Sequence, residues 1–170
     1  MKFRHLLNLS TLFAMLFSFA KADSLTVGDA APAVSGITDS GAALNLADVY
    51  SKNAYTVVFF YPKALTGGCT KQGCSLRDAS DKLAQQGVAI VGVSTDPVEK
   101  QKEFREVNHF PYPLIADTDK KVVKAFGQAG TGMAARECYL IKNGKIVYKD
   151  SGVTAKQADN ILAFLATQKN

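Results

Sequence analysis

The chain has three cysteines, and two of them, Cys69 and Cys74, lie only five residues apart. They belong to the segment "PKALTGGCTKQGCSLRD", residues 62–78, which follows an apolar run ending at Tyr61. The run predicts a buried strand, and a helix is expected to begin near Cys69. Free backbone N–H groups and the positive end of the helix dipole gather in a first helical turn, where they stabilise a thiolate over a thiol. The pattern therefore indicates a nucleophilic thiol at Cys69.

The residues ahead of this cysteine suit a small binding pocket. Thr66 provides a hydroxyl that can donate to or accept from a bound ligand. Gly67 and Gly68 are predicted to let the backbone turn sharply and to leave space beside the sulfur. Pro62 lacks an N–H and stiffens the entrance of the loop.

Other uses of the two cysteines remain open at this point. Residues five apart on a helix are separated by about 7.5 Å along its axis, which does not favour a direct disulfide while the helix is intact. A metal site usually needs a closer Cys pair and two more ligands, and His109 is the single histidine after residue 22, so no metal is expected. Two inert buried thiols are the remaining alternative.

The first 22 residues have the pattern that is typical of a cleaved secretory signal peptide. A basic start is followed by the apolar run "TLFAMLFSFA" and by an Ala-x-Ala site at Ala20–Ala22. The run is shorter than the roughly 20 residues that span a bilayer. We expect one domain over residues 23–170, exported, with the periplasm as its compartment, and no membrane attachment after cleavage.

Composition argues against nucleic-acid binding. The net charge is +5, but three of the 20 basic residues (Lys2, Arg4 and Lys21) lie in the signal segment. No Lys/Arg cluster with interleaved aromatic residues follows it.

Apolar runs and helical patterns alternate along the chain, which predicts an α/β fold with a central sheet flanked by helices. The expected strands lie at 55–62, 87–95 and 112–119, and in a hairpin over 137–150 that turns at Asn143-Gly144. The expected helices lie at 71–87, at 96–110 with Asp96 as its cap, at 119–127 and at 154–168. The terminal hairpin makes the predicted sheet mixed.

Several of these motifs resemble those of the peroxiredoxins. "PKALTGGC" is similar to the family signature P-x-x-x-T-x-x-C, and a second cysteine five residues later resembles the Q-type branch, the bacterioferritin comigratory proteins. "VGDAAPAVSG", "PYPLIADTDKKVVKAFG" and "AARECYLI" resemble other segments of that family. The resemblance covers nearly the whole chain after residue 22 and implies a thioredoxin-like fold.

The resemblance also implies an activity and a role for each site residue. Cys69 would be the peroxidatic thiolate, Thr66 would orient the peroxide, and Pro62 would shield the pocket. Arg136 would hold the thiolate and polarise the O–O bond, and Cys74 would resolve the sulfenic acid as a Cys69–Cys74 disulfide. The implied substrates are hydrogen peroxide and organic hydroperoxides. No cofactor is implied, a thioredoxin-like or other dithiol protein would be the reductant, and a monomer is sufficient.

Forming that disulfide requires the first turns of the helix to unwind. Gly73, directly before Cys74, is expected to help, because glycine weakens a helix by about 1 kcal/mol relative to alanine.

Two residues depart from the family pattern. Gly67 stands where proline is frequent, which predicts a more flexible loop. Cys138 stands where Thr or Ser is usual, and strand alternation places it on the same face as Arg136. It is either a small buried residue or an auxiliary thiol that pairs with Cys69 when Cys74 is absent.

Two other functions compete with a peroxidase. One is a thioredoxin-like thiol–disulfide exchange protein, although the chain has no Cys-x-x-Cys motif. The other is a redox sensor that oxidises at Cys69 without turnover.

Overall fold

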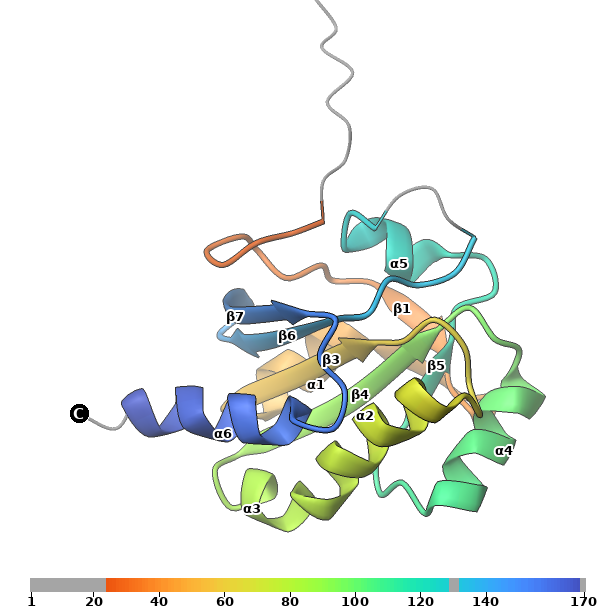
Figure 1. Cartoon of the computed structure of the whole chain (residues 1–170). Coiled ribbons are helices and arrows are strands. Elements are labelled where there is room, and N and C mark those ends of the chain that lie inside the picture. Colours follow the sequence, from red (N-terminus) through yellow and green to blue (C-terminus); the bar gives the residue numbers. More distant parts are fainter. Residues whose placement is uncertain (1–23, 129–131, 169–170) are drawn as a thin grey trace, which may run out of the picture.

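A computed structural model of the protein describes residues 24–128 and 132–168. A five-stranded sheet with the order β5-β4-β3-β6-β7 forms its centre (Figure 1). The strands are β3 (Tyr55–Phe60), β4 (Val88–Ser94), β5 (Leu114–Ala116), β6 (Glu137–Lys142) and β7 (Lys145–Ser151). The first three are parallel to one another, whereas β6 runs antiparallel to β3 and β7 antiparallel to β6. The predicted mixed sheet is therefore confirmed.

Helices cover both faces of this sheet (Figure 1). One face carries α2 (Gly67–Asp78), α3 (Ser80–Ala84), α4 (Val98–Asn108) and α6 (Gln157–Thr167), and the other carries α1 (Leu46–Lys52) and α5 (Lys121–Ala125). Neighbouring residues of β3 supply the two cores: Phe59 points to the first face and Phe60 to the second, and both are fully buried. Alternation along a strand produces this division.

The hairpin between β6 and β7 turns where the sequence predicts it. Asn143 and Gly144 have φ angles of 50° and 71°. Positive φ at both central residues is the geometry that Asn-Gly favours in two-residue hairpins.

Three short elements were not predicted, and one predicted helix is divided. The small antiparallel pair β1 (Ser35–Ile37) and β2 (Ala43–Asn45) and the helix α1 are too short to give a clear periodic signal. The helix expected over 71–87 is broken at Ala79, whose φ and ψ of −100° and 3° separate α2 from α3. No proline or glycine marks this break in the sequence.

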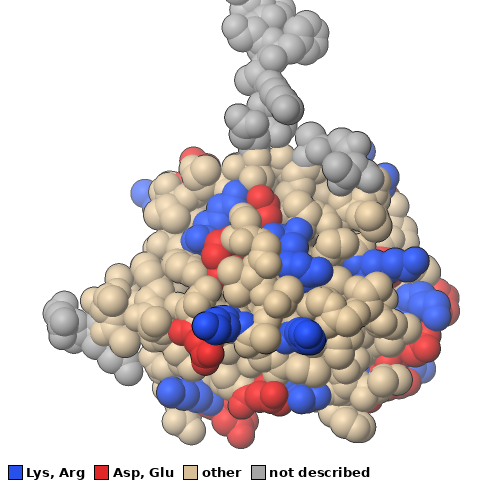
Figure 2. Space-filling view, in the orientation of Figure 1, with Lys and Arg blue, Asp and Glu red and all other residues tan. Residues whose placement is uncertain are grey.

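The expected signal peptide, residues 1–22, lies outside the described residues. Within 24–128 and 132–168, no helix has the length and apolar character needed to cross a membrane. Acidic and basic side chains are interleaved on the face that Figure 2 presents.

Gly73 has a packing role in α2 that the sequence did not reveal. A Cβ atom at this position would lie 2.5 Å from Cζ of Phe110, whose ring stacks on Tyr112. The hydroxyl of Tyr112 donates to the carbonyl oxygen of Gly73 at 2.7 Å. Both aromatic side chains are buried. Gly73 therefore allows the 110–112 segment to pack directly on the helix backbone.

This packing predicts that Gly73→Ala destabilises the protein. Alanine favours a helix by about 1 kcal/mol, but displacing a buried ring costs about 1–3 kcal/mol, so we expect a net loss of roughly 1–2 kcal/mol. Gly67→Ala is the matched control, because nothing lies within 4 Å of a Cβ there. Denaturant unfolding followed by circular dichroism measures both. A Gly73→Ala variant as stable as Gly67→Ala would contradict the packing argument.

Candidate active site

Cys69 is the third residue of α2, immediately after the loop that follows β3. The helix begins at Gly67, with Thr66 as its N-cap. Cys69 is 1% exposed. The predicted position in the first helical turn is confirmed, so the sulfur lies at the end of α2 where free N–H groups and the positive dipole end gather.

A guanidinium group faces this sulfur. Arg136, directly before β6, donates from Nη2 to Sγ of Cys69 at 3.3 Å and from Nη1 to Oε1 of Gln72 at 2.7 Å. A Cβ on Gly68 would lie 3.2 Å from the same Nη2 atom. Gly68 therefore leaves room for the arginine to reach the cysteine. The structure thus brings together Arg136 and Cys69, as the resemblance to the peroxiredoxins implies.

Thr66 lies at the exposed edge of this site. Its hydroxyl donates to the carbonyl oxygen of Lys63 at 2.8 Å and makes no capping bond to α2. A hydroxyl has one hydrogen and two lone pairs, so Thr66 can still accept a hydrogen bond from a ligand.

The sharp turn of the loop does not come from the glycines. Leu65 has φ of 63°, whereas neither Gly67 nor Gly68 has a positive φ. The expectation that the glycine pair makes the turn is therefore wrong, and Gly67 borders open space instead. A leucine in this left-handed region carries backbone strain, which is found most often at functional sites.

Asp96 holds the loop in place, a role that the sequence analysis missed. The carboxylate accepts from the backbone N–H of Ala64 at 2.7 Å and from the hydroxyl of Ser94 at 2.8 Å. It does not cap α4, whose N-cap is Pro97, so the predicted Asp96 cap is wrong. Because β3 and β4 are parallel neighbours, the loops at their carboxyl ends meet at one edge of the sheet. That topology could have indicated the contact between Asp96 and the loop that starts at the half-buried Pro62.

Cys74 lies in the same helix as Cys69, and both are free thiols. Cys74 is half-buried, with its sulfur 3.8 Å from Oδ1 of Asn108. The intact helix separates the two sulfurs, because a rise of 1.5 Å per residue places their backbones about 7.5 Å apart along the axis.

Cys138 is fully buried in β6, opposite Phe59 of β3 and Asp150 of β7. It belongs to the same core cluster as Cys69, on the face that the sequence predicted. Burial raises the pKa of the Cys138 thiol, and the negative charge of Asp150 adds to the effect. Both causes favour a protonated thiol. Within the described ranges, no three His, Cys, Asp or Glu side chains form a group that could hold a metal ion.

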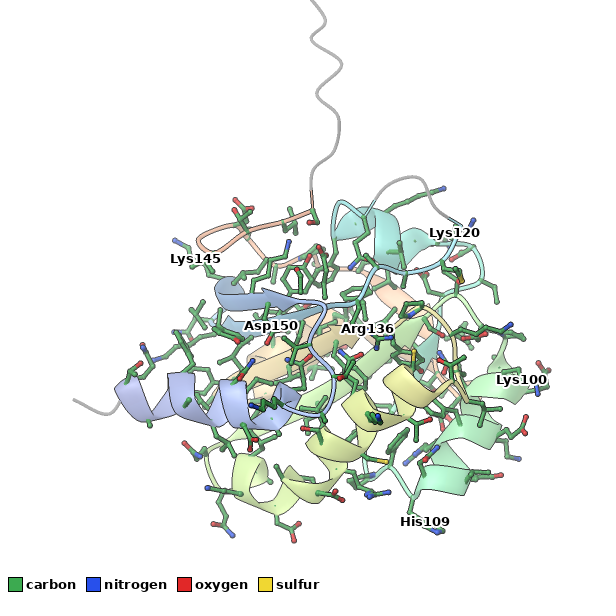
Figure 3. The ribbon with its side chains drawn as sticks, viewed as in Figure 1. Lys100, His109, Lys120, Arg136, Lys145 and Asp150 are labelled. Carbon is green, nitrogen blue, oxygen red and sulfur yellow. The ribbon has the colours of Figure 1, made fainter. Side chains whose placement is uncertain are left out.

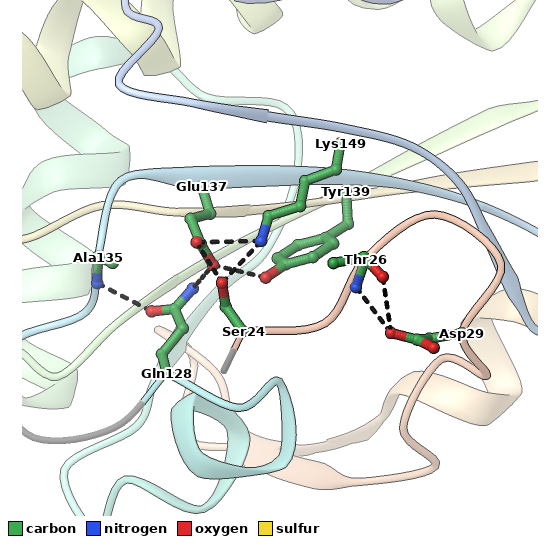
Figure 4. A network of polar contacts seen from close by, with 8 residues as sticks. All are labelled: Ser24, Thr26, Asp29, Gln128, Ala135, Glu137, Tyr139 and Lys149. Carbon is green, nitrogen blue, oxygen red and sulfur yellow. Dashed lines mark hydrogen bonds and ion pairs between the residues drawn. The ribbon is translucent and has the colours of Figure 1, made fainter. Parts of the chain in front are cut away.

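The opposite side of β6 is fixed by a buried polar network around Glu137 (Figure 4). The carboxylate forms an ion pair with Lys149 at 3.2 Å and accepts hydrogen bonds from Ser24, Gln128 and Tyr139. Burial alone would raise the pKa of Glu137, but these hydrogen bonds and the charge of Lys149 hold it below its ordinary value. Because Glu137 directly follows Arg136, the network anchors the backbone that carries the arginine.

Comparisons with known proteins agree with this fold. The AhpC/TSA family model matches residues 27–149. Peroxiredoxin Bcp of Escherichia coli is 42% identical over 106 residues, which are 62% of this chain and 67% of that protein. Peroxiredoxin bcp1 of Schizosaccharomyces pombe is 33% identical over 135 residues, which are 77% of this chain and 69% of that protein.

A solved structure extends the similarity. The crystal structure of peroxidoxin BcpB from Mycobacterium tuberculosis superposes with a TM-score of 0.79 at 32% identity, covering 86% of this chain and 99% of that one. The chain therefore belongs to the AhpC/TSA family and has its thioredoxin-like fold. Within that family it falls in the Q-type peroxiredoxin branch, the bacterioferritin comigratory proteins, and is a thiol-dependent peroxidase.

The Glu137 network predicts acid-sensitive stability. The folded-state pKa of Glu137 lies below 4.5, so its contribution to stability is present above that pH and is lost as the pH falls through the folded-state value. Glu137→Gln should lose about 1–3 kcal/mol at neutral pH and depend less on pH than the wild type between about pH 6 and pH 3. Denaturant unfolding at each pH measures this, with the exposed Glu106→Gln as control. Parallel stability profiles for wild type and Glu137→Gln would contradict the assignment.

Proposed function

We propose that Cys69 is the peroxidatic thiolate and reduces hydrogen peroxide and organic hydroperoxides. The observation that carries the proposal is the 3.3 Å contact between Nη2 of Arg136 and Sγ of Cys69 in the first turn of α2. A cationic group and a helix N-terminus around one sulfur are the surroundings in which reactive cysteines are found.

In the first step, the thiolate attacks one oxygen of the peroxide. An S–O bond forms, the O–O bond breaks, and the other oxygen leaves as an alkoxide or hydroxide that takes up a proton. The products are a sulfenic acid on Cys69 and an alcohol or water. Arg136 and the backbone N–H groups of the first turn stabilise charge on the leaving oxygen. The Thr66 hydroxyl accepts a hydrogen bond from the peroxide and orients it, and Pro62 shields the pocket.

In the second step, the thiol of Cys74 attacks the sulfenic sulfur, forming the Cys69–Cys74 disulfide and releasing water. Both cysteines lie in α2, so the helix must unwind between them. The contacts of Gly73 with Phe110 and Tyr112 resist this change near Cys74. We therefore place the unwinding in the first turns of the helix, around Cys69.

Burial of the nucleophile disfavours the competing exchange function. A thiol that attacks protein disulfides must reach a large partner, whereas Cys69 is 1% exposed. A peroxide is a much smaller molecule and needs far less access to the sulfur.

The remaining parts of the cycle are also proposals. A thioredoxin-like or other dithiol protein returns the disulfide to two thiols, and the protein works as a monomer. The basic and apolar start of the chain supports a signal peptide over residues 1–22 and export to the periplasm.

Peptide mapping after one equivalent of hydrogen peroxide tests the cycle. Reduced protein should lose two hydrogens, located in a Cys69–Cys74 bridge. Mass spectrometry suits this chain because it has no tryptophan to report the change by fluorescence. An unchanged mass would contradict the peroxidase proposal, and oxygen added at Cys69 without a bridge would contradict the role of Cys74.

Two variants complete this experiment. Cys69→Ser should show no rapid reaction. Cys74→Ser should stop at an oxygenated Cys69, because burial keeps Cys138 protonated and out of reach of solvent. A Cys69–Cys138 linkage in Cys74→Ser would establish Cys138 as the auxiliary thiol instead.

A further inference from the structure

A chain of hydrogen bonds, buried at its centre and part-buried at both ends, continues from the active-site arginine to a carboxylate on β7. Nη1 of Arg136 donates to Oε1 of Gln72 at 2.7 Å, and Nε2 of Gln72 donates to Oε1 of Gln157 at 3.0 Å. Nε2 of Gln157 then donates to the two carboxylate oxygens of Asp150 at 2.8 and 3.0 Å. Arg136 and Asp150 lie on the side of the sheet that faces α2 and α6 (Figure 3).

The groups at the two ends, Arg136 and Asp150, determine the donor-to-acceptor direction of these hydrogen bonds. A guanidinium group can only donate, so Gln72 must present its oxygen to Arg136. An ionised carboxylate can only accept, so Gln157 must present its NH₂ group to Asp150. These two requirements agree, and each amide between them has a single orientation that satisfies every bond.

Burial makes this direction costly to reverse. Gln72 and Gln157 are both 0% exposed, so water cannot replace a bond that a reversed amide loses. If the two amides turned over, the NH₂ group of Gln72 would face the N–H groups of Arg136. Unpaired buried donors are unfavourable, so the arginine would move away from its place over Cys69.

The arrangement also leaves the charge of Arg136 available to the sulfur. Over the described residues, no ion pair involves Arg136, whose side-chain partners are Cys69 and the neutral Gln72. The carboxylate of Asp150, which orients these hydrogen bonds, is separated from Arg136 by the two amide groups. It can direct the guanidinium group without forming an ion pair that would compete with the thiolate.

We propose that Asp150 and Gln157 are positioning residues for the peroxidase reaction. They act through Gln72 to fix the guanidinium of Arg136 against Cys69, and they touch neither sulfur nor substrate. The proposal rests on the proposed role of Cys69.

The same contacts tie α6 to the folded form of α2. Besides the bond between Gln72 and Gln157, the backbone N–H of Ala158 donates to Oγ of Ser75 at 3.0 Å. Unwinding the start of α2 to release Cys69 also carries Gln72 away from Gln157. The hydrogen bonds that lead from Arg136 through Gln72 and Gln157 to Asp150 are called the relay below. They position Arg136 only while Cys69 lies in the first turn of the intact helix, where it can react with a peroxide.

Asp150→Asn and Gln157→Met test the relay. The first variant allows the two amides to reverse. The second removes the amide of Gln157 and puts a side chain of similar volume in its place. Each should slow the reaction of Cys69 with hydrogen peroxide by roughly tenfold and move the pH profile of its alkylation by iodoacetamide to higher pH. The double variant should be no slower than either single variant, since one break already disables the relay. Asp159→Asn, the same change at an exposed position of α6, is the control and should leave both measurements unchanged.

The proposal is overturned if both single variants react with hydrogen peroxide at the wild-type rate and keep the wild-type pH profile of alkylation, whatever their melting temperatures. Additive effects in the double variant would overturn it as well, because independent residues add. If Asp150→Asn does not fold, Gln157→Met alone decides by the same two measurements. A wild-type protein that itself reacts with peroxide no faster than a free thiol would overturn the proposed function, which is a separate result.

Discussion

The guanidinium group of Arg136 lies 3.3 Å from the sulfur of Cys69, although the two residues are 67 positions apart in the chain. Features on both faces of the sheet keep the two groups together. β3 and β6 are adjacent, so the loop after one and the residue before the other meet at the same edge. Gly68 provides the space for the arginine, and the Glu137 network holds the start of β6 from the opposite face.

In the proposed cycle, the helix α2 has to meet two opposed demands. It must be intact to place Cys69 in its first turn, and it must open for Cys74 to reach the oxidised sulfur. Its second half is fixed by the aromatic pair Phe110 and Tyr112, which pack on Gly73. Its start has a different kind of support, namely the strained turn at Leu65 and side-chain hydrogen bonds. Polar contacts that depend on orientation can be broken and remade in each cycle at lower cost than a buried aromatic core.

The sequence predicted the sheet, the hairpin and the place of Cys69 in a first helical turn because these leave local signals. β3 is a continuous apolar run, Asn143-Gly144 specifies its turn, and the family signature surrounds Cys69. What the sequence did not show are contacts between distant segments. Asp96 looked like a helix cap but holds Ala64, and Gly73 also accommodates Phe110. Gln72 and Gln157, which are 85 residues apart, have no sequence pattern that links them. Such contacts depend on tertiary packing, which no local pattern encodes.

We expect the charge of Arg136 to make Cys69 reactive toward peroxides. Rapid-mixing kinetics of reduced wild-type and Arg136→Met protein with hydrogen peroxide test it most directly, with circular dichroism to verify that α2 is intact. The second-order rate constant should be at least roughly 100-fold lower in the variant, because removing one such donor costs about 2.7–4 kcal/mol of transition-state stabilisation. A correctly folded Arg136→Met protein that reacts at the wild-type rate would show that Arg136 does not have this role.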